Sequence, residues 1–576
     1  MKTSRWVVLE TDADLTLMSK VLGISPVTAN VMANRGLRTK KTALNFLAPS
    51  SAKMHDTLEM KGVAKAIALL SQAIKEKSKI MIYGDYDVDG VMSTVILYKM
   101  LVLNGANVDF YIPHRIEEGY GLNEKAVRQL YEDGVEILLT VDNGISAMNE
   151  ITIANELGMK VIVLDHHEPG FVETDAGRED ELPPAAVIID PKQADCPYPF
   201  KELCAGGLAY KLAIALGGLT GDQQDELLAL AAIATVCDIV NLQDENRIIV
   251  KEGLKILNAN KLINPGLGSL ITTRGYLDKP IDGFCIGFVL GPCLNATGRL
   301  GSARKSVELL LTVESTMRIA IAAELCSLND ERKKLTTDCV SRAISSLSEP
   351  LDKILVLTDI EAHESVAGIV AGRIKEDTGR PTILLTQGDG AMKGSGRSIE
   401  GYNLFEALFA HKHLFTRFGG HPMAAGLTMP SENIPKLREA LNGECSLTEN
   451  DFIPSIFIDR ELEAADINLK LSNELTRLAP FGKGNREPLF LSRKLYVEHC
   501  RVINEKSTLI FTFSTVAGKL KGITFGMNEA YTNAVKAAGV RPLGGFYMDV
   551  VYGIETNTYN GISSVQIRLK DFKVNM

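Results

Sequence analysis

The chain has 576 residues, which at roughly 150 residues per domain predicts three to four domains. Its contents of 45% hydrophobic, 23% charged and 6% aromatic residues are those of a folded globular protein, and they exclude a collagenous, mucin-like or disordered chain. The net charge of −9 argues against a protein that coats nucleic acid through bulk charge.

Charge is distributed unevenly along the chain. Residues 481–576 contain 13 Lys and Arg against 7 Asp and Glu, a net charge of +6, and the residues before them carry −15. We therefore expect any polyanionic ligand to be held locally, with the basic C-terminal part as one candidate.

Three features bear on the compartment. Residues 1–18 contain no apolar run of signal-peptide length, so we expect no export. The longest apolar stretch, residues 227–237, is too short for the roughly 20 residues of a membrane-spanning helix, so we expect no contact with a membrane. Nine cysteines without a CxxC pair fit a reducing compartment, and together these features predict a cytoplasmic protein.

A rhythm of short apolar runs and amphipathic stretches begins at residue 79. Five runs have the length and composition of buried strands: 79–84, 107–112, 136–142, 160–165 and 185–190. The stretches between them have helical spacing of apolar residues. Alternating strands and helices predict an α/β domain with a parallel sheet, in which functional sites lie beyond the carboxyl ends of the strands.

Three carboxylates directly follow the first of these strands. In GDYDVDG (residues 84–90), Asp85, Asp87 and Asp89 are spaced at i, i+2 and i+4, and an extended backbone would place all three on one face. Like charges this close repel one another unless a cation binds their oxygens. The segment is a candidate metal site, and the alternative is an ordinary Asp-rich turn.

Acids and imidazoles also follow later elements. Asp142 ends the third predicted strand, and the DHH sequence of residues 165–167 ends the fourth. Each alone can be a helix cap, but their repetition at one edge of the sheet favours a shared site. Asp238 ends the apolar segment 227–237, where a carboxylate needs a metal ion, an arginine or backbone N–H groups as its partner.

The ligand types indicate the metal and the chemistry. Carboxylates with neutral imidazoles and no thiolate favour Mn²⁺ or Mg²⁺ over structural zinc. Six or seven such ligands suffice for two divalent ions, and paired ions suit in-line displacement at phosphorus. Phosphoester hydrolysis is the predicted reaction.

A long amphipathic helix is predicted between residues 313 and 347, about 50 Å at 1.5 Å per residue. Its charged interval, residues 329–334, favours a bridge between two domains over a buried packing helix. A second, smaller α/β unit follows, with strands at 353–358 and 381–386 around a helix at 365–376.

This second unit contains two glycine-rich segments suited to an anion. Ser395 and Arg397 lie in KGSGRS (393–398), and Gly420 and His421 lie in RFGGHP (417–422). Small residues leave the backbone open and a guanidinium adds charge, which suits a phosphate. Two glycine turns with incidental charges are the alternative.

Two further arginines are candidates for phosphate contacts. Arg115 lies in PHR (113–115) and Arg299 in NATGR (295–299), and either can equally be a surface or structural residue. The C-terminal part shows period-two alternation at 509–513 and 565–569 and a YNG turn at 559–561, which predicts a mostly β domain such as a small barrel. Its aromatic and basic residues are compatible with base stacking or with a core.

Six motifs occur together in a fixed order: GDYDVDG (84–90), VDNG (141–144), DHH (165–167), ATVCD (234–238), SGRS (395–398) and GGHPMAAG (419–426). At these motifs the sequence resembles the DHH/DHHA1 phosphoesterase superfamily. Within it, the match is to the bacterial single-strand-specific 5′ to 3′ DNA exonucleases. Further similar segments extend it over nearly the whole chain: 35–36, 46–47, 118–121, 295–299 and 480–485.

The resemblance implies a fold and a domain order. It implies a DHH domain with a parallel sheet and a DHHA1 α/β domain joined by a long helix, followed by an OB-fold β-barrel. The expected boundaries are an N-terminal helical extension 1–75, a DHH domain 76–310, a connecting helix 311–350, a DHHA1 domain 351–445 and an OB-fold domain 446–576.

The resemblance also implies site residues. The implied metal ligands are Asp85, Asp87, Asp89, Asp142, His166 and Asp238. His167 is implied as a catalytic or supporting group beside Asp142 and His166. Ser395, Arg397 and His421 are implied to hold the 5′ end.

The implied activity is metal-dependent 5′ to 3′ hydrolysis of single-stranded DNA that releases 5′-mononucleotides in DNA repair and recombination. Single-strand-binding protein and a helicase are the implied protein partners. Three other functions stay in consideration: a DHH phosphoesterase of oligonucleotides or cyclic dinucleotides, a non-catalytic DNA-binding scaffold, and a dinucleotide-cofactor protein. The last lacks GxGxxG after the first strand.

Overall fold

The computed structural model describes residues 4–115, 117–174, 177–388, 390–503 and 508–575. It consists of two compact units, one formed by 55–240 with 252–453 and the other by 1–54, 241–251 and 454–576. Among the described residues, no single helix has the length and apolar composition to cross a membrane. The helix pair Leu15–Leu22 and Pro26–Asn34 meets these criteria only jointly and is bent by 109°.

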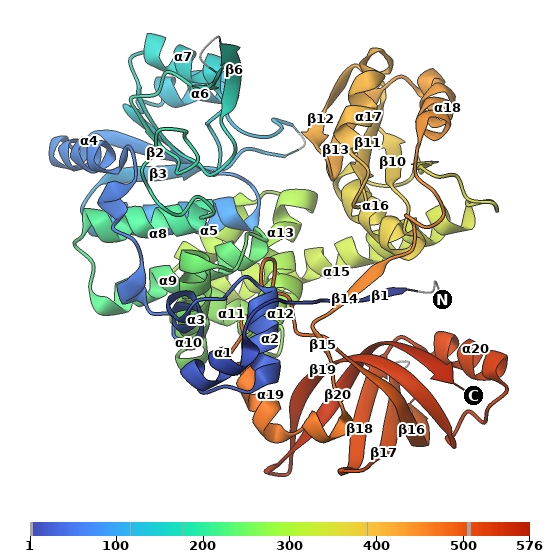
Figure 1. The fold of residues 1–576 in the computed structure, drawn as a ribbon. Coiled ribbons are helices and arrows are strands. Elements are labelled where there is room, and N and C mark those ends of the chain that lie inside the picture. Colours follow the sequence, from blue (N-terminus) through green and yellow to red (C-terminus); the bar gives the residue numbers. More distant parts are fainter. Residues whose placement is uncertain (1–3, 116, 175–176, 389, 504–507, 576) are drawn as a thin grey trace. The chain divides into compact units, whose positions relative to one another are not determined.

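The larger unit begins with a five-stranded parallel sheet (Figure 1). Its strand order is β3 (Asn107–Tyr111), β2 (Lys79–Tyr83), β4 (Ile137–Val141), β5 (Lys160–Leu164) and β8 (Val187–Ile189). All five strands fall within the predicted apolar runs. The strands are nearly continuous apolar sequence because both faces of the sheet are covered.

Helices cover both faces of this sheet. On one face α6 (Glu124–Glu132) and α7 (Met148–Glu156) share a core with the strands. On the other face lie α4 (Val63–Glu76), α5 (Val88–Leu103) and α8 (Ala205–Leu216). A small hairpin of β6 (Gly170–Thr174) and β7 (Gly177–Glu181) is inserted before β8.

A helical layer follows the sheet. It contains α9 (Gly221–Cys237), α10 (Asp244–Ala259), α11 (Pro265–Thr273), α12 (Gly283–Cys285), a π-helical turn (Ile286–Leu290), α13 (Gly291–Leu300) and α14 (Arg304–Leu311). α5, α8 and α9 pack against one another, so the layer is anchored to the first sheet. α10 runs from the smaller unit into the larger one.

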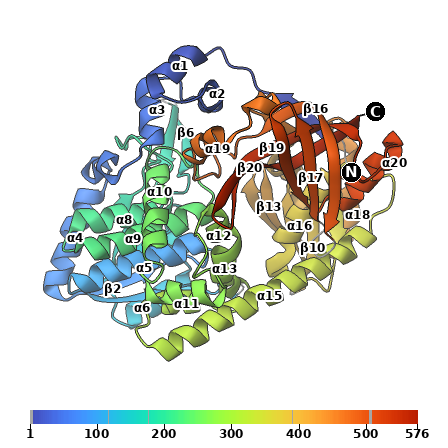
Figure 2. The same cartoon turned by 90° about the horizontal axis from the view of Figure 1, so that it is seen from below.

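The predicted long helix is α15 (Ser315–Ser345), whose 31 residues span about 46 Å. Its first half packs against α11, α13 and α14, and its second half packs against α16 (Glu364–Thr378). The helix therefore joins the two α/β domains of the larger unit, as Figure 2 shows.

The second sheet has the order β12 (Arg417–His421), β13 (Ala424–Met429), β11 (Met392–Arg397), β10 (Thr382–Gln387) and β9 (Leu355–Thr358). Only β9 and β10 are parallel. α16 and the end of α15 cover one face, and α17 (Leu404–Ala410) and α18 (Ile434–Glu444) share a core with the other.

The smaller unit is built around a closed five-stranded barrel. Its strands are β16 (Phe490–Ile503), β17 (Thr508–Thr515), β18 (Gly518–Phe525), β20 (Ile562–Asn575) and β19 (Phe546–Tyr559), and the β16–β19 pairing closes it. α19 (Leu469–Thr476) and α20 (Asn528–Ala538) flank the strands, and β15 (Arg460–Glu461) pairs with β16. The Tyr559–Gly561 turn joins β19 and β20, as predicted.

The N-terminal segment packs with this barrel. Side chains of α1 (Leu15–Leu22), α2 (Pro26–Asn34) and α3 (Lys40–Leu47) share one core with the barrel. β1 (Arg5–Val8) pairs in parallel with β14 (Ser455–Ile458). Residues that are more than 400 positions apart in the sequence therefore fold together.

Candidate metal centre and phosphate pocket

The Asp-rich segment 84–90 is more tightly wound than the sequence predicts. Instead of an extended run, Asp87 caps α5, accepting a hydrogen bond from the Gly90 backbone N–H at 3.0 Å, so Asp89 lies in the first helical turn. The carboxylates gather because the chain turns here, which corrects the expectation of an extended backbone. A Cβ at Gly90 would lie 2.5 Å from the Asp85 carbonyl oxygen, so this close turn requires a glycine.

The other predicted acids and imidazoles converge on the same place. His166 Nε2 lies 3.1 Å from Asp142 Oδ1, 3.7 Å from Asp89 Oδ2 and 3.8 Å from Asp238 Oδ2. Three groups have ligand atoms within 4.8 Å of one another: Asp142, His166 and His167; Asp89, His166 and Asp238; Asp85, Asp87 and Asp142. Asp142 and His166 recur in these groups, so the residues form one cluster able to bridge neighbouring ions.

Backbone N–H groups and a further acid orient the cluster. Both oxygens of Asp89 accept 2.8 Å hydrogen bonds, from the N–H groups of Ala205 and Gly206 at the start of α8. Asp165 Oδ1 lies 2.7 Å from His167 Nδ1 and fixes that ring. The sequence analysis did not select Asp165 as a site residue, although its position at the end of a strand beside His166 was an available signal.

The cluster contains carboxylate oxygens that are available to bind a cation. Asp85 Oδ1 and Asp238 Oδ2 are buried and have no hydrogen-bond partner. Within the described part of the chain, no Lys or Arg forms a salt bridge with any of the five clustered aspartates. Buried carboxylates that form no salt bridge with Lys or Arg fit hard divalent cations such as Mn²⁺ and Mg²⁺.

Burial and mutual repulsion strongly favour the protonated carboxyl groups when no cation is bound. Burial, reinforced by Asp87, raises the pKa of Asp85 to about 8 and the pKa of Asp89 to about 7. Burial and the charge of Asp89 raise the pKa of Asp238 to about 8 and hold the pKa of Asp142 well above its usual range. A divalent ion would replace these protons.

The pKa values of the two histidines are shifted in opposite directions. Burial and the neighbouring His167 lower the pKa of His166 to about 3, so it is a neutral nitrogen ligand near neutral pH. Burial also disfavours charge on His167, but its hydrogen bond to Asp165 and the nearby carboxylates outweigh this and raise its pKa to about 9. In the absence of an ion His167 is therefore a cation beside the cluster.

Tyr120 lies at the rim of this centre. Its hydroxyl donates to the Asp142 backbone carbonyl oxygen at 3.1 Å and lies 3.4 Å from His167 Nε2. The residue belongs to the EGYG segment, but the sequence alone gave no reason to place it beside the metal ligands.

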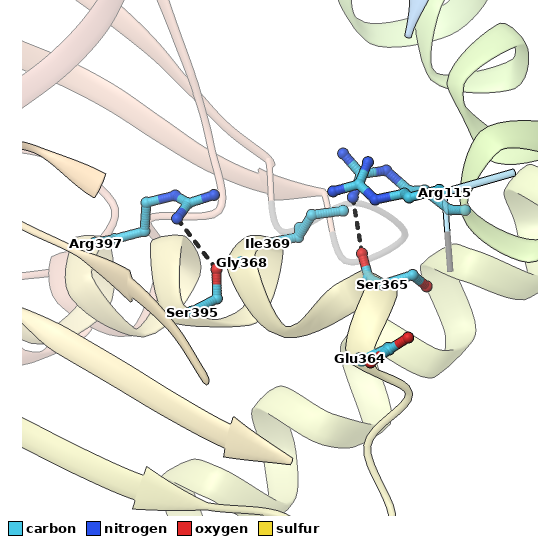
Figure 3. A pocket seen from close by; sticks show the side chains of 8 residues that line it. Arg115, Glu364, Ser365, Gly368, Ile369, Ser395 and Arg397 are labelled. Atoms are coloured by element: carbon cyan, nitrogen blue, oxygen red, sulfur yellow. Dashed lines mark hydrogen bonds between the residues drawn. The ribbon is translucent and has the colours of Figure 1, made fainter. Parts of the chain in front are cut away.

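A cavity of about 320 Å³ is lined by residues of both α/β domains (Figure 3). Its lining residues are Arg115, Arg299, Glu364, Ser365, Gly368, Ile369, Ser395 and Arg397. Arg299 Nη1 donates to the Ser365 carbonyl oxygen at 2.8 Å, and Arg397 Nη1 donates to the Gly396 carbonyl oxygen at 2.7 Å. Four of the six predicted phosphate-contact residues therefore meet in one pocket.

The pocket and the metal centre share the loop that contains Tyr86. The Arg115 guanidinium lies 4.8 Å from the centre of the Tyr86 ring. A Cβ at Gly298, which precedes Arg299, would lie 2.6 Å from the Tyr86 carbonyl oxygen. The cationic pocket is therefore built directly against the Asp-rich segment.

Gly420 and His421 lie on β12, outside the lining of this pocket. His421 is in register with Ala424, which is in register with Arg397, so the three form one row across the sheet. Both residues are exposed. Ser365 and Gly368 of α16 do line the pocket, although no motif in the sequence marked them.

Three family models match the chain: the DHH family N-terminal domain over residues 79–235, the DHHA1 domain over 351–447 and the RecJ OB domain over 458–571. The single-stranded-DNA-specific exonuclease RecJ of Bacillus subtilis is 39% identical over 99% of this chain and 71% of its own length. The Escherichia coli enzyme of that name is 33% identical over 94% of this chain and 95% of its own.

The chain belongs to the RecJ family. Solved structures agree with the sequence comparison: Thermus thermophilus RecJ in complex with Mn²⁺ has a TM-score of 0.82 at 30% identity and covers 99% of this chain and 79% of its own. The complex of the same protein with Mg²⁺ has a TM-score of 0.75 at 28% identity, with 99% and 78% coverage. The expected RecJ-family architecture of DHH domain, DHHA1 domain and OB barrel is confirmed.

Proposed function

We propose that this protein hydrolyses single-stranded DNA from its 5′ end with two divalent ions, Mn²⁺ or Mg²⁺, and releases 5′-mononucleotides. The observation that carries the proposal is the cationic pocket built against the carboxylate and imidazole cluster. A terminal phosphate in the pocket would leave the next phosphodiester at the cluster. The RecJ relatives named as single-stranded-DNA-specific exonucleases support the substrate.

We assign the metal ligands as Asp85, Asp87, Asp89, Asp142, His166 and Asp238. Bound divalent ions would activate water and stabilise the charge that develops on the phosphoryl oxygens. Asp165 orients the His167 ring, and His167 lies where it can hold or transfer a proton near the scissile phosphate. Tyr120 positions both the Asp142 backbone and His167.

We assign the 5′-phosphate contacts to Arg115, Arg299, Ser395 and Arg397. The guanidiniums provide several N–H donors to a phosphate, which is the group they recognise best. We propose that His421, in the same sheet row as Arg397, and its neighbour Gly420 contact the first nucleotide beside the phosphate. We propose that the pocket accepts a strand terminus and excludes an internal phosphate with chain on both sides, and that this sets the 5′ to 3′ polarity.

Two other functions are less well supported. A non-catalytic scaffold would not need every member of the buried cluster, and all are present here. An enzyme for oligonucleotides or cyclic dinucleotides would not need the barrel that matches the RecJ OB domain. We therefore retain the strand exonuclease, acting in DNA repair and recombination.

We extend the proposal to domains, partners and compartment. The domain boundaries are 1–75, 76–310, 311–350, 351–445 and 446–576, with the first segment packing partly with the barrel. A single-strand-binding protein and a helicase would supply the strand, and the protein would act in the cytoplasm. The rate of label release from DNA coated with single-strand-binding protein, compared with the rate from bare DNA, would test whether that protein is a partner.

The direct test replaces Asp142 by alanine. Because Asp142 takes part in two of the three ligand groups, hydrolysis should fall by at least about 10³-fold, while the arginine pocket should keep its affinity for a 5′-phosphorylated strand. Hydrolysis is followed with end-labelled single and double strands in Mn²⁺, and binding by fluorescence anisotropy. Unchanged turnover of the variant would refute the assignment.

A further inference from the structure

The arginines of the phosphate pocket continue beyond it. Arg299 approaches Arg115, Arg397 and also Arg332 of α15, and burial and these guanidiniums lower its pKa to about 10. Arg332 in turn approaches Arg373 of α16, and burial together with that neighbour lowers its pKa. The five guanidiniums therefore form a series of electrostatic neighbours that begins in the pocket and ends at Arg373, which is exposed on α16.

Asp85 of the metal centre interacts electrostatically with Arg115 of this group. Among the described residues, no Asp or Glu forms a salt bridge with any of the five guanidiniums. Arg299 and Arg332 donate only to neutral oxygens, of the Ser365 backbone and the Asn329 side chain. Glu364, the acid in the pocket lining, already lies 2.7 Å from Lys393 Nζ. A bound anion would therefore reduce the repulsion among these arginines.

One face of α16 leads from the pocket to the outer arginines. Ser365 and Ile369 line the pocket, and Arg373 follows at the same four-residue interval on that face. Between them, Gly368 and Gly372 present no side chain, and a Cβ at Gly372 would only reach 4.0 Å from Arg397 Cγ. Arg373 therefore lies on the face of α16 that continues from the pocket lining, and the positive N-terminal end of the helix dipole lies at the pocket.

We propose that Arg332 and Arg373 bind the outer phosphates of a strand whose 5′ end carries a di- or triphosphate. This inference rests on the proposed function and adds a substrate class to it. A terminal monophosphate carries at most about two negative charges, which Arg115, Arg299 and Arg397 can balance. The two outer guanidiniums are then available for a longer, more negative terminus.

The reaction at such an end is the same hydrolysis. The oxygen of water bonds to the phosphorus between the first and second nucleotides, the bond from that phosphorus to the 3′ oxygen breaks, and a proton from water goes to the 3′ oxygen. The terminal polyphosphate stays intact. The product is a nucleoside 5′-triphosphate, and the shortened strand carries a 5′-monophosphate.

The experiment compares three single strands of one sequence with a 5′-hydroxyl, a 5′-monophosphate or a 5′-triphosphate. The full-length protein in Mn²⁺ should degrade the triphosphate strand within about threefold of the monophosphate strand and release the nucleoside triphosphate, identified by chromatography. Arg332→Gln/Arg373→Gln should slow removal of the triphosphate nucleotide by about tenfold or more and change the monophosphate rate by less than about twofold.

A control variant with the same change in charge distinguishes binding at a specific phosphate site from a general effect of positive charge. Lys333→Gln/Lys375→Gln removes two positive charges from the same two helices and should leave the ratio of triphosphate to monophosphate rates unchanged. If the wild-type protein degrades the monophosphate strand but not the triphosphate strand, or if both double variants change the ratio equally, the inference is overturned. If the wild type degrades none of the three strands, the proposed function itself fails.

Discussion

At the scale of single residues, the site depends on atoms that have no alternative partner. Asp85 and Asp238 each bury an oxygen without a hydrogen bond, and the His166 ring lies between three carboxylates. Such a cluster is unfavourable without a cation, so it is evidence for ion binding independent of any family resemblance. Individual acids in the sequence could not show that an ion binds here, because each acid alone is equally consistent with a helix cap.

Gly368 of α16 lies against two side chains of the phosphate pocket. A Cβ at Gly368 would lie 2.6 Å from Arg397 Nη2 and 2.9 Å from Ser395 Oγ, both mobile side-chain ends that would be pushed out of the pocket. Gly368→Ala should therefore lower the rate on 5′-phosphorylated strands by about tenfold while the rate on 5′-hydroxyl strands changes little.

Gly372→Ala is the matched control, since its Cβ would approach nothing closer than 4.0 Å. Gly372→Ala should stabilise α16 by about 0.5–1 kcal/mol, because alanine favours the helix, whereas the close contacts at Gly368 should offset this gain in Gly368→Ala. Equal rates for the two variants on phosphorylated strands would show that Ser395 and Arg397 do not hold the phosphate.

At the scale of elements, the contact between α8 and α9 positions two ligands at once. The N-terminal N–H groups of α8 hold Asp89, and α9 ends at Asp238. A Cβ at Gly206 would lie 2.4 Å from the Ala234 Cβ and 3.1 Å from Asp89 Oδ1. The two helices can approach this closely only because residue 206 has no side chain.

Gly206→Ala should force the helices apart. We expect a loss of about 1–3 kcal/mol in the free energy of unfolding and weaker Mn²⁺ binding, measured by denaturant titration and calorimetry. Gly221→Ala, at the open start of α9, should leave both quantities nearly unchanged. Normal Mn²⁺ affinity in Gly206→Ala would mean that this helix contact does not position the ligands.

At the scale of the whole molecule, the raised carboxyl pKa values link stability to pH and metal. The folded-state pKa values of Asp85, Asp89 and Asp238, about 8, 7 and 8, lie above the unfolded value of about 3.9. These groups therefore stabilise the ion-free fold most below pH 4, and this stabilisation is lost as pH rises through 7 to 8. Bound ions reverse the dependence by replacing the protons.

The melting temperature of the ion-free protein should accordingly fall between pH 6 and pH 8.5, and the increase caused by saturating Mn²⁺ should become larger over the same interval. Differential scanning calorimetry with chelator or Mn²⁺ measures both. In Asp142→Ala the metal-induced increase should be small at every pH. A metal-induced increase in wild type that shrinks towards pH 8.5 would contradict the linkage.

The shared core of the N-terminal segment and the barrel determines how the barrel can be removed. Deleting residues 454–576 alone would expose Val31, Met32 and their neighbours, which are buried in that core. The fragment 55–453 removes both the N-terminal segment and the barrel and keeps only residues 241–251 of the smaller unit. It should still hydrolyse dinucleotides but lose about tenfold or more on long strands, because we expect the barrel, which matches the RecJ OB domain, to bind extended strands. Equal losses on both substrates would assign the barrel a structural role.

The sequence by itself determined the local features of this protein. Continuous apolar runs specify strands buried on both faces, the 31-residue helix follows from its spacing, and the acids at strand ends follow from the geometry of parallel sheets. Each of these depends on residues close together in the chain. Ordered motifs then identified the superfamily.

Only the tertiary structure decided which of these features meet. Asp165 and Tyr120 join the metal centre, Ser365 and Gly368 join the pocket, and Gly420 and His421 lie outside its lining. Residues 1–54 pack with a barrel that begins more than 400 residues later. No local pattern encodes such contacts, because they depend on how helices and sheets pack after each has formed, and that packing is set by shape and burial over the whole chain.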